Sequence, residues 1–322
     1  MDPKVSICVP VYNAEKYLRK ALDSIVNQTY PYHEVIVSDN ASTDNSYNIA
    51  QEYAGPKVKI VRNDKNLYGI KNYNKLINMA QGDLIALYHS DDMYEPTIVE
   101  EEVKEFIRHP QLGAVFTAAY MIDENDAIIG EYFLDERLKH CDMIDFNMGL
   151  LSFLECGRCS FLFPTSMVPK KIYDAVGPFT TEFSYAADHD MHYRIMVKAP
   201  VIIIDKKLFK YRRYKEQSSA TSIQKGRKPN EIFHLFNKFL KSPALTIKID
   251  RKLLSLIKRD EKQDYYTCAV NSLKRNDIKY AEEMLCNAVK INPGLFDCII
   301  NAAIRAGKTA LLAPLLIALK GK

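Results

Sequence analysis

The chain has 322 residues, of which 47% are hydrophobic and 26% are charged, and its formal net charge is +4. These values are ordinary for a folded globular protein and allow one large domain plus a smaller region. No run of about 18 apolar residues is present, which argues against a membrane-spanning helix. The start, Met1-Asp2-Pro3-Lys4, lacks the basic and apolar segments of a signal peptide.

The seven cysteines are scattered and odd in number. Cys8 lies inside an apolar run, where a free thiol packs as a small hydrophobic group, so we expect a reducing compartment and a cytoplasmic location. Cys156 and Cys159 form one Cys-x-x-Cys pair, with His140-Cys141 upstream. This pattern leaves zinc binding open, but no second pair supports it, and two unlinked thiols are the favoured interpretation.

Short apolar runs alternate with helical patterns through the first half of the chain. Each run is brief and continuous, which is typical of buried parallel strands. Ser42 is a candidate N-cap, and Pro110 ends the last of these helices. The alternation predicts an α/β fold with a parallel sheet covered by helices. Strands are expected at residues 5–9, 35–37, 58–61, 84–88 and from 114, and helices at 18–26, 43–53, 76–80 and 96–109.

The second half is less regular. Residues 121–130 predict two strands joined by a turn at 123–126, and no pattern is clear from there to Phe163. Helices are expected at 170–176 and 188–198, and a strand at 201–204. After residue 226 the pattern is helical, and residues 265–293 resemble one tetratricopeptide-type hairpin. We therefore expect one domain over 1–225 and a helical region over 226–322, packed on the first domain or forming a homodimer.

Three polar clusters follow predicted strands, namely Tyr12-Asn13, Asp39-Asn40 and Asp91-Asp92. Ligands of parallel sheets bind beyond the carboxyl ends of the strands, so these clusters predict one shared site. Adjacent carboxylates at the end of a buried strand repel each other and lose hydration. A divalent cation would relieve both problems and could bind a phosphate at the same time.

Positive charge is concentrated in residues 206–259, which hold sixteen Lys/Arg and three Asp/Glu, a balance of 16 − 3 = +13. The rest of the chain is therefore +4 − 13 = −9. A solvated, helix-rich surface is the simpler interpretation of this charge. The alternative is a patch that meets anionic lipid or a phosphate-bearing acceptor. No recognition motif accompanies the charge, so we expect no nucleic-acid partner.

The polar clusters belong to an ordered set of short motifs that resembles family 2 glycosyltransferases. The set covers the first hundred residues closely, continues loosely to about Ser219 and leaves out the C-terminal helices. The resemblance implies a GT-A fold, which is a Rossmann-like, mixed but mostly parallel sheet sandwiched by helices. The residues that carry it are Pro10-Val11-Tyr12-Asn13-Ala14-Glu15, Val37-Ser38-Asp39-Asn40-Ala41-Ser42-Thr43-Asp44, Asn66, Gly69, Asn72-Tyr73-Asn74, Gly82-Asp83 and His89-Ser90-Asp91-Asp92.

The resemblance assigns the donor site. Asp39 resembles the aspartate that reads the base, where a carboxylate accepts the N3–H of uracil. Asp92 would bind Mn²⁺ or Mg²⁺, and Asp91 would contact the ribose or the metal. Turn formation by Asp39 and helix capping by one residue of the pair are the structural alternatives. The implied nucleotide-binding residues are Pro10, Val11, Tyr12, Asn13, Glu15, Asp39, Asn66, Gly69, Asn72 and Asp91, and the implied metal ligands are Asp92 and Asp91.

The resemblance places the catalytic base at Asp188, which would take a proton from the acceptor hydroxyl. The family has a glutamate where this chain has Ala187, which weakens the motif. Asp190 is a fallback base or a structural residue, and His189 is expected at the surface or on the acceptor side. Two aspartates that stabilise a helix N-terminus are the alternative.

The family often has a histidine where this chain has Tyr214. A tyrosine with an ordinary pKa of about 10 is a poor metal ligand at neutral pH, so the third protein ligand is open. Arg212 or Arg213 could instead grip the diphosphate, or both could belong to the basic surface.

Together these features predict an inverting, metal-dependent glycosyltransferase that uses a nucleotide-sugar, UDP-linked in our expectation. The acceptor would be a glycan or lipid-linked glycan, and the basic segment suggests peripheral contact with the inner face of the plasma membrane. A nucleotidyltransferase is the enzyme alternative, but Val9 to Glu15 lacks the expected glycine- and lysine-rich loop. A non-catalytic scaffold with the same fold is the other alternative.

Overall fold

The protein is described by a computed structural model that covers residues 2–215, 228–291, 293–312, 314 and 316. The chain divides into two compact units, Met1–Gln217 and Ser218–Lys322. The predicted boundary between residues 225 and 226 lies outside the described residues, so it stays a prediction. Each unit is described by itself below.

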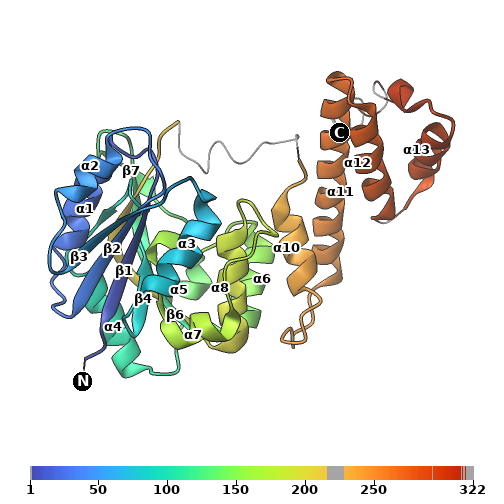
Figure 1. The fold of residues 1–322 in the computed structure, drawn as a ribbon. Coiled ribbons are helices and arrows are strands. Elements are labelled where there is room, and N and C mark those ends of the chain that lie inside the picture. Colours follow the sequence, from blue (N-terminus) through green and yellow to red (C-terminus); the bar gives the residue numbers. More distant parts are fainter. Residues whose placement is uncertain (1, 216–227, 292, 313, 315, 317–322) are drawn as a thin grey trace. The chain divides into compact units, whose positions relative to one another are not determined.

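One mixed sheet forms the centre of the first unit (Figure 1). Its strands lie in the order β3-β2-β1-β4-β8-β6-β9-β5, and β7 pairs with the outer part of β6. The pairs β1–β2, β1–β4, β2–β3 and β6–β9 are parallel, and the others are antiparallel. The predicted α/β fold with a mixed, mostly parallel sheet is confirmed. The strands are β1 (Val5–Val11), β2 (His33–Asp39), β3 (Val58–Arg62), β4 (Leu84–Leu87), β5 (Met93–Tyr94), β6 (Ala114–Ile122), β7 (Ile128–Glu131), β8 (Met167–Pro169) and β9 (Val201–Arg212).

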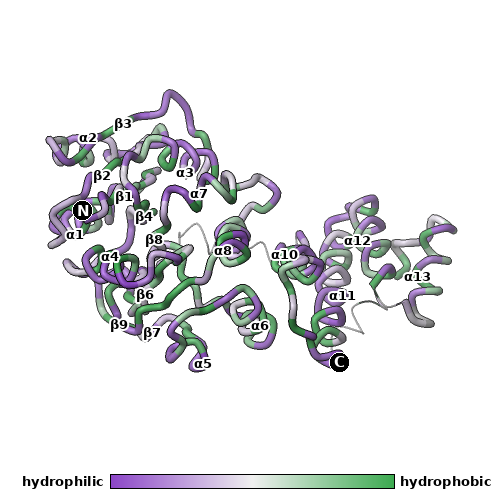
Figure 2. Tube along the Cα trace, turned by 90° about the horizontal axis from the view of Figure 1, so that it is seen from below, coloured by the Kyte–Doolittle hydropathy of each residue, from purple (hydrophilic) through white to green (hydrophobic). Residues whose placement is uncertain are grey.

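Helices cover both faces of this sheet. Helices α1, α2 and α4 lie on one face, while α3, α7 and α8 lie on the other (Figure 1). Their buried residues meet the central strands, whose mostly hydrophobic composition is visible along β6 in Figure 2. The helices are α1 (Leu18–Val26), α2 (Ser46–Gln51), α3 (Tyr68–Met79), α4 (Ile98–Arg108), α5 (Glu136–Lys139), α6 (Phe146–Cys156), α7 (Lys170–Val176) and α8 (Ala187–Lys198), with a short 3₁₀ turn at Phe163–Thr165.

The register of the parallel strands aligns their polar ends. Val11 of β1 lies opposite Asp39 of β2, and Asp39 lies opposite Arg62 of β3. On the other side of β1, Cys8 pairs with Leu87, the last residue of β4. The residues that follow these strands therefore meet at one edge of the sheet, as expected for a parallel arrangement.

Gly82 and Asp83, which belong to the family-like motifs, have structural roles at the start of β4. A Cβ atom on Gly82 would lie 2.6 Å from the backbone nitrogen of Ser6 and 2.8 Å from the carbonyl oxygen of Lys4. Only glycine allows this close approach of the chain to β1. The Asp83 carboxylate accepts a 2.9 Å hydrogen bond from the backbone N–H of Lys4. Both residues thus fix the entry into β4, at the edge opposite the polar cluster.

Several element predictions were wrong in their bounds, and helix α3 begins at Tyr68, well before the expected residues 76–80. Helix α2 begins at Ser46 instead of residue 43, because Ser42 accepts a hydrogen bond from the backbone N–H of Asn13 and does not cap the helix. Strand β9 continues to Arg212, because irregularities in its pairing with β6 after Thr117 let it bend and remain paired. The stretch before Phe163 contains α5 and α6, each capped by the aspartate that precedes it.

The second unit is helical, as predicted. It contains α10 (Glu231–Phe239), α11 (Arg251–Lys274), α12 (Ile278–Lys290), α13 (Leu295–Arg305) and a 3₁₀ turn at Thr309–Leu312. Helices α11 and α12 pack through Ala269, Leu285 and Ala288, all fully buried, which gives the expected helical hairpin. Hydrophobic and hydrophilic residues alternate along both helices in Figure 2, as one buried face requires. Its assignment as a tetratricopeptide-type hairpin stays a prediction.

Candidate functional site

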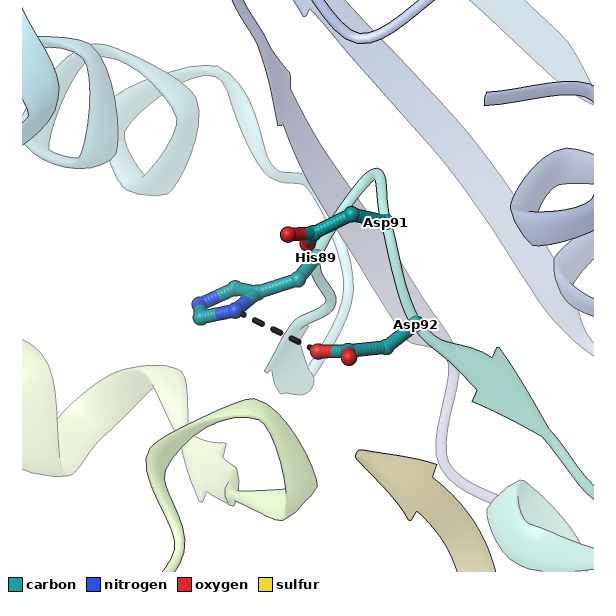
Figure 3. A group of neighbouring side chains, drawn as sticks. All are labelled: His89, Asp91 and Asp92. Atoms are coloured by element: carbon teal, nitrogen blue, oxygen red, sulfur yellow. Dashed lines mark ion pairs between the residues drawn. The ribbon is translucent and has the colours of Figure 1, made fainter. Parts of the chain in front are cut away.

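A compact group of ligand-type side chains follows β4. His89, Asp91 and Asp92 each offer one ligand atom, and these three atoms lie within 4.8 Å of one another. Figure 3 shows the three side chains turned toward one another on the loop between β4 and β5. Asp92 is fully buried, and its Oδ2 pairs with Nδ1 of His89 at 3.5 Å. Two carboxylates and an imidazole suit Mn²⁺, and the two carboxylates also suit Mg²⁺.

The electrostatics of this group favour a cation. Burial raises the pKa of Asp92 to about 6, and the charge of Asp91 adds to the rise. Burial would lower the pKa of His89, but its contact with Asp92 and the charges of Asp91 and Asp188 raise it. Apart from its 3.5 Å ion pair with His89, the buried Oδ2 atom of Asp92 accepts no hydrogen bond from the described residues. His89 compensates an ionised carboxylate in that position only in part, and a metal ion would add to the compensation.

The end of β9 supports the same two aspartates. The backbone N–H of Arg212 donates to Oδ1 of Asp92 at 2.8 Å, and its Nε donates to the carbonyl oxygen of Asp91 at 2.8 Å. The Tyr214 hydroxyl donates to Oδ2 of Asp91 at 2.8 Å. Burial and the Asp91 charge raise the pKa of Tyr214, which keeps the hydroxyl protonated. Tyr214 therefore holds Asp91 by a hydrogen bond, where the family often has a histidine.

The suggestion that Arg212 grips a diphosphate is wrong. Its side chain is fully buried, and its guanidinium contacts protein groups of two loops. Arg213 is exposed and lies over the ring of Tyr211, 5.8 Å from the ring centre, so it stays a candidate for phosphate contact.

Asp39 ends β2 in a fully buried position. Its Oδ2 pairs with Nε of Arg62 at 3.1 Å and accepts a 3.3 Å hydrogen bond from the backbone N–H of Ser42. Its Oδ1 is buried and accepts no hydrogen bond from any residue that the structure describes. A buried carboxylate with one open oxygen is ready to accept a single N–H group from a ligand.

An asparagine network surrounds Asp39. The side chain of Asn40 donates to Asn66 at 2.9 Å and accepts from Asn63 at 2.8 Å. Asn72 is buried and accepts hydrogen bonds from Ser38 at 2.8 Å and from Asn63 at 3.1 Å. In the structure Asn66 and Asn72 thus support the loop after β2, and their predicted contact with a nucleotide stays a prediction.

The loop after β1 is fixed against the loop after β2. Asn13 has a positive φ of 48°, and its side chain accepts a 2.9 Å hydrogen bond from the backbone N–H of Thr43. Glu15 accepts a 2.8 Å hydrogen bond from the backbone N–H of Asn45. These bonds leave Tyr12, 48% exposed, at the open side of the edge. Among the other predicted contacts, Pro10 and the buried Val11 lie in β1, and Gly69 lies exposed in the first turn of α3.

Asp188 lies in the first turn of α8 and is partly buried. Its Oδ1 accepts hydrogen bonds from the backbone N–H of His189 at 2.8 Å and pairs with Nδ1 of His189 at 2.7 Å. Burial would raise the pKa of Asp188, but His189 lowers it to about 2, so the carboxylate is ionised at neutral pH. Asp190 is buried and pairs with Arg194 at 2.8 Å, which gives it a structural contact.

Tyr73 feels the charge of both groups of carboxylates, and Phe163 lies beside Tyr73 and His89. The pKa of Tyr73 is raised by burial and by the charges of Asp188, Asp91 and Asp92 together. The ring of Phe163 lies 5.4 Å from that of Tyr73 and 5.7 Å from that of His89. Asp188 therefore lies near enough to the Asp91-Asp92 pair to act on the same tyrosine and on His89, and its role on the acceptor side stays a prediction.

The Cys-x-x-Cys pair makes other contacts. The Cys156 thiol donates to Oδ2 of Asp135 at 3.5 Å, and the buried Cys159 thiol donates to the carbonyl oxygen of Phe161 at 3.7 Å. All seven cysteines are free thiols.

The sequence prediction left out Arg62, His89 as a candidate ligand, and the contact of His189 with Asp188. Arg62 ends β3 just as Asp39 ends β2, so the rule of polar strand ends could have found it. His89 stands within the quoted motif, and its three-residue spacing from Asp92 was a signal. The His189 contact depends on a rotamer, which no spacing reveals.

The matches to known proteins agree with this geometry. The sequence model for glycosyl transferase family 2 matches residues 6–165. The chain belongs to glycosyltransferase family 2. A Rickettsia felis protein described as an uncharacterized glycosyltransferase is 27% identical over 245 residues, which are 73% of this chain and 38% of that protein. The matched region thus spans well under half of that relative.

Two solved structures of other proteins have the same fold as this family 2 glycosyltransferase. Residues 1–349 of S. aureus TarS in complex with UDP-GlcNAc superpose with a TM-score of 0.65 at 17% identity, over 97% of this chain and 90% of that one. The mannosyltransferase PcManGT from Pyrobaculum calidifontis, in complex with GDP-Man and Mn²⁺, has a TM-score of 0.56 at 18% identity, over 99% and 87%. Both likenesses confirm the predicted GT-A fold.

The helices offer no candidate for a membrane span. Among the described residues, none of them combines the length and the apolar character that crossing a bilayer requires.

Proposed function

We propose that this family 2 member is an inverting, metal-dependent glycosyltransferase that uses a UDP-sugar donor. The observation that carries the proposal is the group of ligand atoms of His89, Asp91 and Asp92 within 4.8 Å of one another, in which the buried Oδ2 of Asp92 has only the His89 ion pair among the described residues. Asp92 and Asp91 would hold Mn²⁺ or Mg²⁺, with His89 as a third ligand for Mn²⁺. The bound ion would neutralise the charge of the donor diphosphate and of the leaving nucleotide.

The hydrogen bonds around Asp39 favour uracil as the base of the donor nucleotide. Uracil presents one N–H group, at N3, which fits the one open oxygen of Asp39. Guanine presents two adjacent donors, N1–H and the 2-amino group, which would need both carboxylate oxygens. Oδ2 is already engaged by Arg62 and by the Ser42 backbone. Cytosine has no hydrogen at N3 and would face the carboxylate with a second acceptor.

Asp188 is the proposed base. Its ionised carboxylate would take the proton of the acceptor hydroxyl while that oxygen bonds to the anomeric carbon and the bond to the diphosphate breaks. A single base on the acceptor side fits direct displacement, which inverts the anomeric configuration. A positioned base of this kind contributes about 10²–10⁴-fold in rate.

The proposed acceptor is a hydroxyl of a glycan or lipid-linked glycan at the cytoplasmic face of the membrane. Three cations of the basic segment, Lys206, Lys207 and Lys210, pair with glutamates of the first unit. They therefore contribute little free charge, and membrane contact would depend on the other basic residues of 206–259. Vesicles containing anionic lipid should bind the protein in low salt and release it in high salt, whereas equal binding to neutral vesicles would contradict this contact.

The homodimer also stays a proposal. The second unit exposes Leu256 at 43%, Ile299 at 54% and Leu311 at 73%, which are candidates for an apolar contact between copies. A mass measured by light scattering at several concentrations would decide between monomer and dimer.

A panel of UDP-, GDP- and CDP-sugars tests the function, with nucleotide release as the readout. We expect release of UDP that depends on Mn²⁺ or Mg²⁺ and stops with a chelator. Release from GDP-sugars alone would contradict the assignment of the base. A protein that neither binds nor turns over any donor would instead be the non-catalytic scaffold.

A further inference from the structure

Arg212 connects the Asp91-Asp92 pair with a distant turn. Its backbone N–H reaches Asp92, and its Nε reaches the carbonyl oxygen of Asp91, each at 2.8 Å. Its Nη1 donates to the carbonyl oxygen of Asp123 at 3.0 Å and to Oδ1 of Asp126 at 2.5 Å. One side chain therefore bonds to the metal-binding loop at one end and to the turn between β6 and β7 at the other.

The Arg212 guanidinium is buried, so its charge must be compensated by neighbouring protein groups. Arg212 is fully buried, and its guanidinium lies over the ring of Tyr17, 4.5 Å from the ring centre. A buried cation needs a compensating anion and donors matched to acceptors. Asp126 supplies that anion in the structure, and it also pairs with Lys20 at the surface. Both cations lower the pKa of Asp126 despite its partial burial, so it is ionised at neutral pH.

We propose that Arg212 and Asp126 are positioning residues that keep Asp91 and Asp92 available to the metal ion. This inference rests on the metal site of the proposed function. While Asp126 neutralises Arg212, the Nε atom of Arg212 bonds to the backbone carbonyl of Asp91, and both carboxylates of the pair can face a cation. Without the Asp126 charge the buried guanidinium needs another anion, and the Asp91 and Asp92 carboxylates belong to the loop that it already contacts, so it would compete with the metal for them.

The same turn provides a matched control. Glu124 also pairs with a lysine of the α1 region, since its carboxylate lies 3.1 Å from Nζ of Lys16. The described contacts of Arg212 include Asp123 and Asp126 but not the Glu124 side chain. Asp126→Asn and Glu124→Gln therefore each remove one charge from one turn and weaken one lysine pair. Asparagine also tolerates the positive φ of 71° at position 126.

The experiment measures Mn²⁺ binding by calorimetry, without substrate, for the wild-type protein and both variants. We expect Asp126→Asn to weaken Mn²⁺ binding about tenfold and Glu124→Gln to change it less than about twofold, since the loss of a supporting contact around a metal ligand costs about 10–100-fold. Thermal unfolding without metal shows whether each variant folds. Arg212→Lys gives the second arm, because it keeps the charge but loses the forked donors, and we expect weaker Mn²⁺ binding there as well.

The outcomes distinguish the positioning role of Arg212 and Asp126 from the proposed metal site itself. Tight Mn²⁺ binding by wild-type protein and by folded Asp126→Asn alike would overturn the positioning role and leave the metal site intact. If Asp126→Asn does not fold, unchanged Mn²⁺ binding by Arg212→Lys overturns it equally. If the wild-type protein binds no Mn²⁺, the proposed metal site fails, and this inference fails with it.

Discussion

The proposed donor end and the proposed acceptor end of the first unit are built in different ways. At the proposed donor end, Asp39 and Asp92 are fully buried at strand ends, and each has one carboxylate oxygen that accepts no hydrogen bond from the described residues, apart from the His89 ion pair of Asp92. At the acceptor end, Asp188 is partly exposed in the first turn of α8, and its Oδ1 is bonded to His189. The pairing of strands thus fixes the donor groups, whereas side-chain contacts tune the acceptor group.

The largest expected effect breaks the acceptor end alone. Asp188→Asn removes the proton acceptor but keeps the shape, so turnover of the UDP-sugar should fall about 10²–10⁴-fold. Binding of UDP with Mn²⁺ should stay within about twofold, because Asp188 does not contact the nucleotide in our proposal. Nucleotide release and calorimetry on the same preparation give both values. Turnover that survives the substitution would remove the base assignment.

The next effect tests the base-reading role at the donor end. Asp39→Asn replaces a charged acceptor by an amide that can also donate a hydrogen bond. We expect UDP affinity to fall about 10- to 100-fold, as for the loss of a hydrogen bond to a charged group. CDP affinity should hold or rise, because the amide N–H can face N3 of cytosine. Competition binding of UDP and CDP measures the ratio, and an unchanged UDP/CDP preference would contradict the role of Asp39.

Substitutions of Tyr214 test whether this position of the proposed donor end can reach the metal ion. Tyr214→His places a neutral imidazole beside Asp91, where it can serve as a ligand, and should tighten Mn²⁺ binding about fivefold. Tyr214→Phe removes the hydroxyl without adding a ligand, so its Mn²⁺ affinity should not rise. Calorimetry of the pair decides, and equal affinities of both variants would show that position 214 does not reach the metal.

Glu102 is a buried carboxyl group to which we assign no function, so it shows the effect of burial alone. It is fully buried in α4, its Oε1 accepts no hydrogen bond from the described part of the chain, and burial raises its pKa well above the ordinary value. The folded protein must therefore keep a proton that the unfolded chain loses above about pH 4.5, so the group destabilises the fold progressively as pH rises.

Glu102→Gln should accordingly stabilise the protein by about 1 kcal/mol at pH 8, and the gain should vanish near pH 4, where the carboxyl group is protonated in both states. Urea unfolding at the two pH values measures this, and donor binding should not change. A loss of stability at pH 8 would mean that Glu102 has a role beyond its burial.

The same contrast explains how much the sequence could predict. Asp39, Asp91 and Asp92 stand directly after apolar strand runs, and the strand order brings such residues together whatever follows in the chain. Arg212 lies about 120 positions after Asp92 and joins it only because β9 extends past a bend in its pairing with β6. The late start of α2 and the His189 contact depend likewise on individual side-chain hydrogen bonds, which leave no period in the sequence.

The most direct test of the account measures UDP binding by calorimetry with and without Mn²⁺, for the wild-type protein and Asp92→Asn. We expect the wild-type protein to bind UDP with Mn²⁺ and to lose most of that affinity with a chelator. Asp92→Asn should bind UDP weakly and equally in both conditions. UDP binding by the wild-type protein that is indifferent to Mn²⁺, or Mn²⁺-dependent binding that survives in Asp92→Asn, would contradict a metal-dependent donor site at Asp91-Asp92.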